Sequence, residues 1–332
     1  MASSEQLKAL LQSHIEGDNS RFYSIAMQVA AHEAKLGHGK LAEELRSMID
    51  DAKSRSTISQ SPKRPVPINQ PRGELSNLLE VTYPKARLSD MVLNDLVESK
   101  LKRIIKEQRN FTKIREHGLF PRRKLLLVGP PGTGKTMTAS VLAGELGIPL
   151  FLVRLDSLIT KFMGETASKL RQVFDAISDT RAIFFFDEFD AIGSQRGLSN
   201  DIGEIRRVLN SFLQMIEQDG SNSVIIAATN HQELLDYAVF RRFDDVIEYG
   251  LPQSNNIVTV LKTKLVNFKL ARLQWKTLAA SAEGLSYADI CRAAEEAIKD
   301  AIIYDRDKIS ETELKATLED RKSMRIRPSD NK

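Results

Sequence analysis

The sequence has almost no cysteine and no long apolar run. Cys291 is the one cysteine in 332 residues, which excludes an internal disulfide framework and fits a reducing compartment. No apolar run reaches the length of about 18 residues that a membrane-spanning helix needs. The amino terminus lacks a basic segment followed by an apolar core, so no secretory signal is expected. The predicted location is cytoplasmic, with no membrane partner.

Metal-ligand spacing and a strong charge of one sign are also missing. The five histidines are scattered, and His32 and Glu33 are not followed by a second histidine, so neither a zinc site nor a zincin protease helix is expected. The formal net charge of +4 is too small to indicate nucleic acid as a partner. The chain is 42% hydrophobic and 28% charged, which is typical of a soluble globular protein, here of about two domains by length.

A glycine-rich loop stands between a predicted strand at 125–128 and a predicted helix at 137–146. It fills every fixed position of a Walker A motif and consists of Gly129, Pro130, Pro131, Gly132, Thr133, Gly134, Lys135 and Thr136, followed by Met137. Glycines let backbone N–H groups approach phosphate oxygens, and the amino end of the helix favours the same anions. Lys135 can reach the β- and γ-phosphates, and the Thr136 hydroxyl can ligate Mg²⁺. ATP and Mg²⁺ are therefore the expected ligands.

An acidic pair follows the apolar strand expected at 182–186. Asp187 and Glu188 stand directly after its last residue, Phe186. This is the arrangement of a Walker B motif, in which the aspartate holds Mg²⁺ and the glutamate polarises the attacking water as a general base. The acidic pair therefore predicts that the nucleotide is hydrolysed as well as bound.

Strand patterns alternate with helical patterns through the middle of the chain, at 125–128, 150–155, 182–186, 223–228 and 246–249. Such alternation predicts an α/β fold, a P-loop NTPase parallel sheet with helices on both faces. The pattern becomes purely helical afterwards, at 255–268, 275–282, 287–303 and 310–318. We expect a helical N-terminal domain at 1–53, a Ser/Pro-rich linker at 54–73, the large α/β subdomain at 74–252, a helical lid at 253–320 and a basic tail at 321–332.

The N-terminal segment fits two roles. Its short amphipathic helices can form a self-contained bundle or an oligomerisation cap, or they can recruit a substrate or adaptor. The sequence leaves both roles open.

With these motifs in this order, residues 75–318 resemble the AAA family of ATPases in the AAA+ superfamily, which includes the ATPase modules of FtsH-type proteases, katanin and spastin. Segment 185–197 is similar to the family's extended Walker B motif. Segment 228–230 resembles sensor 1, which implies that Asn230 contacts the γ-phosphate and the lytic water. Segment 284–290 is similar to the stretch at sensor 2, which implies a nucleotide contact at Ala288. Segment 88–92 resembles the stretch that packs on adenine, which implies contacts near Asp90, Met91 and Val92.

The same resemblance implies groups that act on a neighbouring subunit. Segment 240–244 resembles the arginine-finger segment, so Arg241 and Arg242 are expected to reach the neighbour's γ-phosphate. A ring or spiral follows, most often a hexamer in this family. Many relatives carry a basic residue after the Phe-Asp pair, whereas Asp245 follows Asp244 here.

A short exposed-type segment resembles the family's first pore loop. It combines an aromatic and an apolar residue with flanking polar residues, Lys161, Phe162 and Met163 before Gly164. Exposed apolar side chains usually mark interaction sites, and a ring of them would grip a polypeptide without sequence specificity. The segment 195–201, at the second pore-loop position, has no apolar residue suited to such a grip.

Three functions are compatible with these motifs. The first is an ATP-hydrolysing motor that remodels, unfolds or disassembles protein substrates by threading them through a ring pore. The second is a nucleotide-switched scaffold or regulator of a separately encoded partner, such as a protease or an effector. The third, a nucleic-acid-handling ATPase, is disfavoured by the weak net charge. Only the basic residues near the carboxyl terminus support it, and a solvated end explains these better.

Overall fold

The computed structural model describes residues 71, 73–158, 163–189, 202–231 and 237–326, with isolated residues between 25 and 47. The chain divides into two compact units, Met1–Ile68 and Asn69–Lys332. In the first unit the described residues include short helical stretches at 25–27, 29–30, 42–43 and 46–47. The remaining part of the expected N-terminal domain and nearly all of the expected linker lie outside the described residues.

Six strands form one sheet in the second unit: β1 (Leu79–Thr82), β2 (Lys124–Val128), β3 (Leu150–Val153), β4 (Ile183–Phe186), β5 (Val224–Thr229) and β6 (Asp245–Glu248). Their order is β1-β3-β4-β5-β2-β6. All neighbours are parallel except β1 and β3, which are antiparallel. Two strand predictions need correction: β1 was not expected, and β3 ends at Val153 because Leu155 already begins helix α8 (Leu155–Leu158).

Both faces of the sheet are buried, and successive residues alternate between them. In β4, Phe184 and Phe186 belong to one apolar cluster, whereas Ile183 and Phe185 belong to the other. A strand buried on both faces needs a continuous apolar run, which is why the central strands could be recognised in the sequence.

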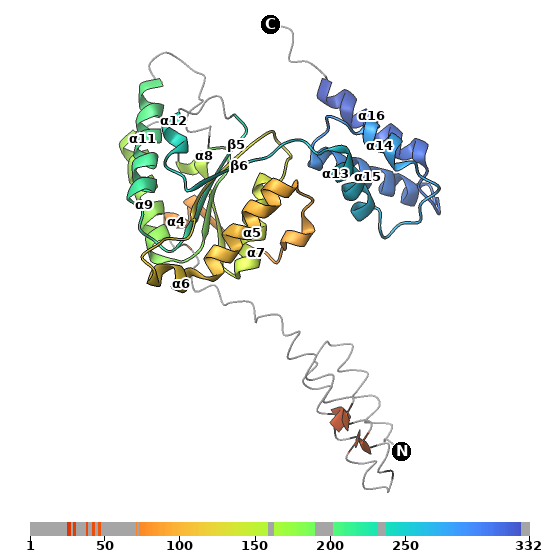
Figure 1. Cartoon of the computed structure of the whole chain (residues 1–332), viewed down its shortest axis with the longest axis horizontal. Coiled ribbons are helices and arrows are strands. Elements are labelled where there is room, and N and C mark those ends of the chain that lie inside the picture. The colour runs from red at the N-terminus through yellow and green to blue at the C-terminus, as the bar shows by residue number, and fades with distance from the viewer. Residues whose placement is uncertain are drawn as a thin grey trace. The chain divides into compact units, whose positions relative to one another are not determined.

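Two helical layers cover the sheet (Figure 1). On one side lie α5 (Asp95–Arg109) and α7 (Lys135–Leu146), and on the other α9 (Met163–Asp179) and α11 (Ile202–Gln218). Short helices α4 (Leu75–Leu78), α6 (Phe111–Glu116) and α12 (Tyr237–Phe240) complete the layers. The start of α5 is fixed by Asn94, whose side chain accepts a hydrogen bond from the Val97 N–H at 2.8 Å.

Four helices follow the sheet and have their own apolar core: α13 (Ser254–Lys264), α14 (Trp275–Ser281), α15 (Tyr287–Ile303) and α16 (Glu311–Ile326). The boundary expected between the lid and a basic tail at residue 321 falls inside a helix, because α16 continues to Ile326. Arg321 and Lys322 lie in α16, where Arg321 binds Glu296 and Lys322 donates to the Ser281 carbonyl at 3.2 Å. In the described part of the chain no helix combines the length and apolarity needed to span a membrane.

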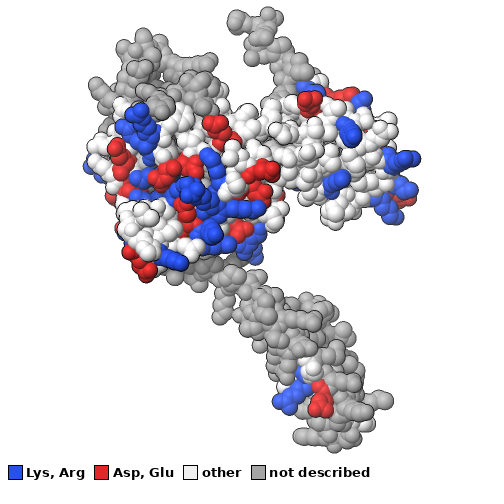
Figure 2. Space-filling view, viewed as in Figure 1, with Lys and Arg blue, Asp and Glu red and all other residues white. Residues whose placement is uncertain are grey.

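Charges of both signs are interspersed on the face of the second unit shown in Figure 2. Several basic side chains of α5 have acidic partners: Lys100 binds Asp245 at 2.9 Å, and Arg103 binds Glu107 at 3.0 Å. Asp245 also lies 3.2 Å from the Arg122 guanidinium. Basic groups paired in this way do not form the continuous positive surface that nucleic-acid binding needs.

Candidate active site

The glycine-rich loop connects β2 to α7, and its glycines are required by the backbone and by close neighbours. Gly129, Gly132 and Gly134 have φ angles of 146°, 75° and 105°, where side chains are strained. A Cβ atom on Gly129 would lie 2.2 Å from the Tyr249 carbonyl oxygen, and one on Gly132 would lie 2.6 Å from Ser286 Oγ. The loop therefore keeps its backbone open in the way that phosphate binding requires.

Lys135 is buried at the first position of α7, with 6% of its surface exposed. Its ammonium group donates to the carbonyl oxygens of Gly129 at 2.7 Å and Pro130 at 2.9 Å, and to Asn230 Oδ1 at 2.7 Å. Asn230 directly follows β5, which is parallel to β2 with Thr229 opposite Val128. The register of these two strands thus joins the expected sensor 1 residue to the glycine-rich loop.

Thr136 and Asp187 bring two oxygen ligands to the same place. Thr136 Oγ1 donates to Asp187 Oδ2 at 2.8 Å, across the gap between the start of α7 and the end of β4. A hydroxyl beside a carboxylate is a donor set of hard oxygens, which fits Mg²⁺. The expected metal ligands therefore lie next to each other.

Glu188 has an unusual backbone conformation. Its φ angle is 50°, in the left-handed region, which costs a residue other than glycine about 1–3 kcal/mol and recurs at functional sites. Two neighbours hold the turn: the Asp187 carboxylate accepts the Glu188 N–H at 3.0 Å, and the buried Phe189 donates its N–H to the Ala228 carbonyl at 2.8 Å. The Glu188 side chain is left exposed to solvent beside Asp187.

The segment that contains the expected adenine-side residues lies beside α7. Asp90 ends the short helix η1 (Leu88–Asp90), and its carboxylate accepts the Arg87 N–H at 2.8 Å. Met91 reaches the loop, because a Cβ on Gly134 would lie 3.1 Å from Met91 Cε. Val92 packs against the core of the helical lid. Met91 therefore lies against the glycine-rich loop and Val92 against the lid. Met137, on α7, is 40% exposed.

Two residues that the sequence reasoning missed fix the adenine-side segment to α7. Gly144 allows a close approach, since a Cβ there would lie 2.1 Å from the Ala86 carbonyl oxygen. Glu145 accepts the Leu88 N–H at 3.1 Å and binds the Arg109 guanidinium at 2.7 Å. Neither belongs to a motif, and their partners are distant in the sequence, so no local signal marks them.

We expect Glu145→Ala to raise the KM for ATP about 3–10-fold and to leave kcat within about twofold, because it loosens the adenine-side segment without touching the phosphates. Steady-state hydrolysis over a range of ATP concentrations measures both constants. Glu116→Ala, which removes an exposed carboxylate on α6, is the matched control. A fall in kcat at unchanged KM would contradict this assignment.

Tyr249 is a second residue that the motifs do not reveal. It follows β6, is 5% exposed, and its hydroxyl lies 2.6 Å from Thr138 Oγ1 on α7. Thr138 Oγ1 in turn donates to the Gly134 carbonyl at 3.0 Å. Burial raises the pKa of the Tyr249 phenol, so it stays protonated and can donate. Tyr249, at the end of β6, thereby supports the glycine-rich loop through Thr138.

The lid contacts the loop directly. The Ala288 N–H, at the start of α15, donates to the Gly132 carbonyl at 3.1 Å. Ser286 caps this helix: its hydroxyl accepts the Asp289 N–H at 3.2 Å, and it also donates to the Asp289 carboxylate at 2.7 Å. Ala288 is thus placed beside the loop, where the resemblance expected a nucleotide contact.

Other expected site residues lie elsewhere. Arg241 and Arg242 precede β6, whereas Tyr249 beside the loop follows it, so the whole strand, four residues and roughly 13 Å long at about 3.3 Å per residue, lies between them in the chain. Lys161, Phe162 and the segment 195–201 lie outside the described residues. Met163 is the first residue of α9.

Fold and site together define a P-loop α/β protein with a helical lid. A family model described as "ATPase family associated with various cellular activities (AAA)" matches residues 125–251. The chain is 37% identical over 320 residues to the "Uncharacterized AAA family ATPase y4kL" of Sinorhizobium fredii, with 96% of each chain covered. The chain belongs to the AAA family of ATPases, and it binds and hydrolyses ATP.

Two further relatives are longer proteins. The chain is 32% identical over 276 residues to the "ATP-dependent zinc metalloprotease FtsH" of Helicobacter felis, with 78% of this chain and 43% of the relative covered. It is 36% identical over 251 residues to "Protein SAV" of Sulfolobus acidocaldarius, with 72% and 32% covered. The chain spans less than half the length of either relative.

Proposed function

We propose that this ATPase is a motor that remodels, unfolds or disassembles protein substrates by threading them through the pore of a ring, most simply a hexamer. The observation that carries the proposal is the placement of Arg241 and Arg242 at the far end of β6 from their own glycine-rich loop. Arginines placed there can complete a neighbour's site more readily than their own. A shared site requires an ordered assembly, and a ring supplies one neighbour for every site.

Within this site each residue has a distinct task. Lys135 and the loop N–H groups bind the phosphates, Asn230 orients the attacking water, and Glu188 accepts its proton. Thr136 and Asp187 would hold Mg²⁺, which when bound supplies positive charge to the phosphate oxygens. Arg241 and Arg242 of the neighbour would stabilise the charge that develops on the γ-phosphate.

The pore-loop residues supply the grip on the substrate in this proposal. In the sequence, Lys161 and Phe162 directly precede α9, and Met163 is its first residue; the last turn of α9 leads to β4 and the acidic pair. Movement of the acidic pair during hydrolysis would therefore be transmitted to the base of this segment through one helix. The FtsH relative is named a protease, which is consistent with protein as the substrate class.

We expect Phe162→Ala to weaken binding of a fluorescent, permanently unfolded polypeptide about tenfold, because the aromatic side chain supplies the contact with the polypeptide. The kcat for ATP hydrolysis is expected to stay within about twofold. Binding is measured by anisotropy with ATP in the Glu188→Gln background, and hydrolysis in the otherwise unchanged chain. Phe162→Tyr keeps the aromatic ring and is expected to retain binding. Undiminished binding and substrate processing by the Phe162→Ala protein would exclude threading.

A nucleotide-switched scaffold is the second candidate, favoured by the separate unit Met1–Ile68, which is large enough to hold a partner. Such a protein works by changing its affinity for the partner between nucleotide states. The Glu188→Gln chain distinguishes the two functions: a scaffold that needs only bound ATP stays active, whereas a motor stops.

A further inference from the structure

The turn that carries Arg241 and Arg242 is held by a set of contacts that no motif describes. It lies between α12 and β6, and the buried Phe243 anchors it in the core. The Arg242 N–H donates to the Val239 carbonyl at 3.1 Å, which continues α12 into the turn. The Arg242 side chain also lies near α11, with Nε 3.4 Å from the Glu217 carboxylate.

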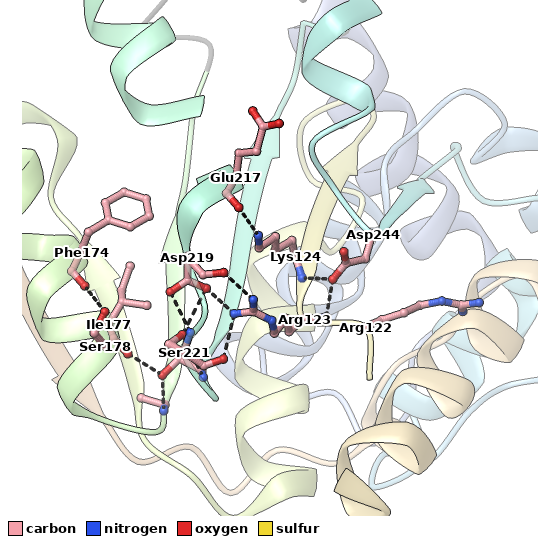
Figure 3. Close-up of polar contacts among 12 residues, drawn as sticks. Arg122, Arg123, Lys124, Phe174, Ile177, Ser178, Glu217, Asp219, Ser221 and Asp244 are labelled. Carbon is pink, nitrogen blue, oxygen red and sulfur yellow. Dashed lines mark hydrogen bonds and ion pairs between the residues drawn. The ribbon is translucent and has the colours of Figure 1, made fainter. Parts of the chain in front are cut away.

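Asp244 ties this turn to the beginning of β2. One oxygen of its carboxylate, Oδ2, accepts the backbone N–H groups of Arg123 at 2.8 Å and Lys124 at 2.9 Å (Figure 3). The Asp244 N–H returns a hydrogen bond to the Lys124 carbonyl at 2.7 Å. The ladder between β2 and β6 begins one residue later, at Leu125 and Asp245. The carboxylate therefore binds backbone groups at the beginning of β2, just before the pairing of β2 with β6 starts. A negative acceptor makes these bonds stronger than neutral ones.

The beginning of β2 is itself fixed from the other side. The buried Arg123 guanidinium binds the Asp219 carboxylate, whose side chain is 1% exposed, and donates to the Ser221 carbonyl at 2.8 Å (Figure 3). Lys124 Nζ reaches the Glu217 carbonyl at 3.4 Å. Separating such a buried ion pair costs folding free energy, so the pair holds the beginning of β2 in one position. Asp244 connects the arginine turn to this arrangement through the backbone of Arg123 and Lys124.

We propose that Asp244 is a positioning residue for the arginine pair: it fixes the turn 241–244 to the amino end of β2, the strand whose carboxyl end continues into the glycine-rich loop. The inference rests on the proposed role of Arg241 and Arg242 in a neighbour's site. The distance between the loop of one subunit and the arginines it offers to the next is then set by β2 and β6, two short paired strands.

Asp244→Asn is the test, because it keeps the size of the side chain and replaces a carboxylate by an amide that accepts less strongly. We expect kcat to fall about 10–100-fold with the KM for ATP and the binding of ATP unchanged, since the misplaced groups belong to the neighbour's site. Asp245→Asn is the matched control, because that carboxylate binds the side chains of Lys100 and Arg122 and no backbone group of β2. An Asp244→Asn protein with the kcat of the unchanged chain would overturn the proposal.

Mixed assemblies separate positioning from a general structural effect. Asp244→Asn subunits keep their own nucleotide site, and Lys135→Ala subunits lose theirs but keep a normal arginine turn. We expect a mixture of the two to hydrolyse ATP several times faster than either alone, because Lys135→Ala subunits complete the sites of Asp244→Asn subunits. No recovery in mixed assemblies confirmed by mass measurement would overturn the proposal.

A third variant makes the rescue specific. Lys135→Ala subunits that also carry Arg241→Ala and Arg242→Ala are expected to give no rescue. If Arg241→Ala and Arg242→Ala leave kcat unchanged in every assembly, the proposed shared site fails. If they lower kcat while Asp244→Asn does not, only the positioning role of Asp244 fails.

Discussion

Glu188→Gln is expected to lower kcat for ATP hydrolysis by about 10²–10⁴-fold while ATP still binds. The side chain is exposed beside Asp187, so an amide of the same shape fits the same turn. It cannot accept a proton, whereas the phosphate-binding groups of the loop, Lys135 included, are unaffected. Product release measured over time gives kcat, and binding of a fluorescent ATP analogue gives the affinity.

Glu80→Gln is the control for this variant, because it removes an exposed carboxylate on the edge strand β1. Glu188→Gln is also the variant with which to recover a bound partner, since ATP stays unhydrolysed and the bound state persists. Hydrolysis at more than about a tenth of the normal rate would mean that another group takes the proton.

Removal of both Arg241 and Arg242 is expected to lower kcat by about 10³–10⁵-fold, the range found when an arginine finger is withdrawn from phosphoryl transfer. The physical reason is loss of positive charge at the γ-phosphate where negative charge develops. Under the proposed shared site, in which the arginines act on a neighbour, the specific activity of the unchanged chain should rise with protein concentration until assembly is complete. Hydrolysis and mass are measured over the same concentration series.

Single variants refine this expectation. Arg242→Ala also breaks a contact with Glu217, so it changes the turn as well as the charge. Arg241→Lys keeps the charge but loses the planar fork of donors, and we expect it to recover only part of the activity. Arg272→Ala, which removes an exposed arginine of the lid, serves as the control. A monomer that hydrolyses ATP at full rate at every concentration would rule out a finger role.

The local signals were sufficient for the central part of the fold. The glycine-rich loop, the acidic pair after β4 and the apolar central strands each depend on a few adjacent residues. In the structure Lys135 binds Asn230, and Thr136 binds Asp187. Strand β1 was missed because it is an edge strand of only four residues, in which the alternation of Leu79 and Val81 with Glu80 and Thr82 is too short to indicate a strand.

Other contacts could not be predicted because the two residues that form each of them are far apart in the sequence. Tyr249 meets Thr138 across 111 positions, and Asp244 meets Arg123 across 121. No motif contains Tyr249, and the segment that contains Asp244 gives no indication that Arg123 is its partner. Only the pairing of β6 with β2 makes them neighbours.

The sequence by itself determined the chemistry: a loop that binds phosphate, an acidic pair placed after a buried strand, and an α/β order of elements. These follow from backbone conformation and burial over short spans, which local residue choice controls. The tertiary structure alone decided how the site is supported and oriented. The lid meets the loop at Gly132, and the arginine turn is fixed to the opposite end of β2 through Asp244. Long-range contacts of this kind depend on strand order and register, which no single segment of the sequence contains.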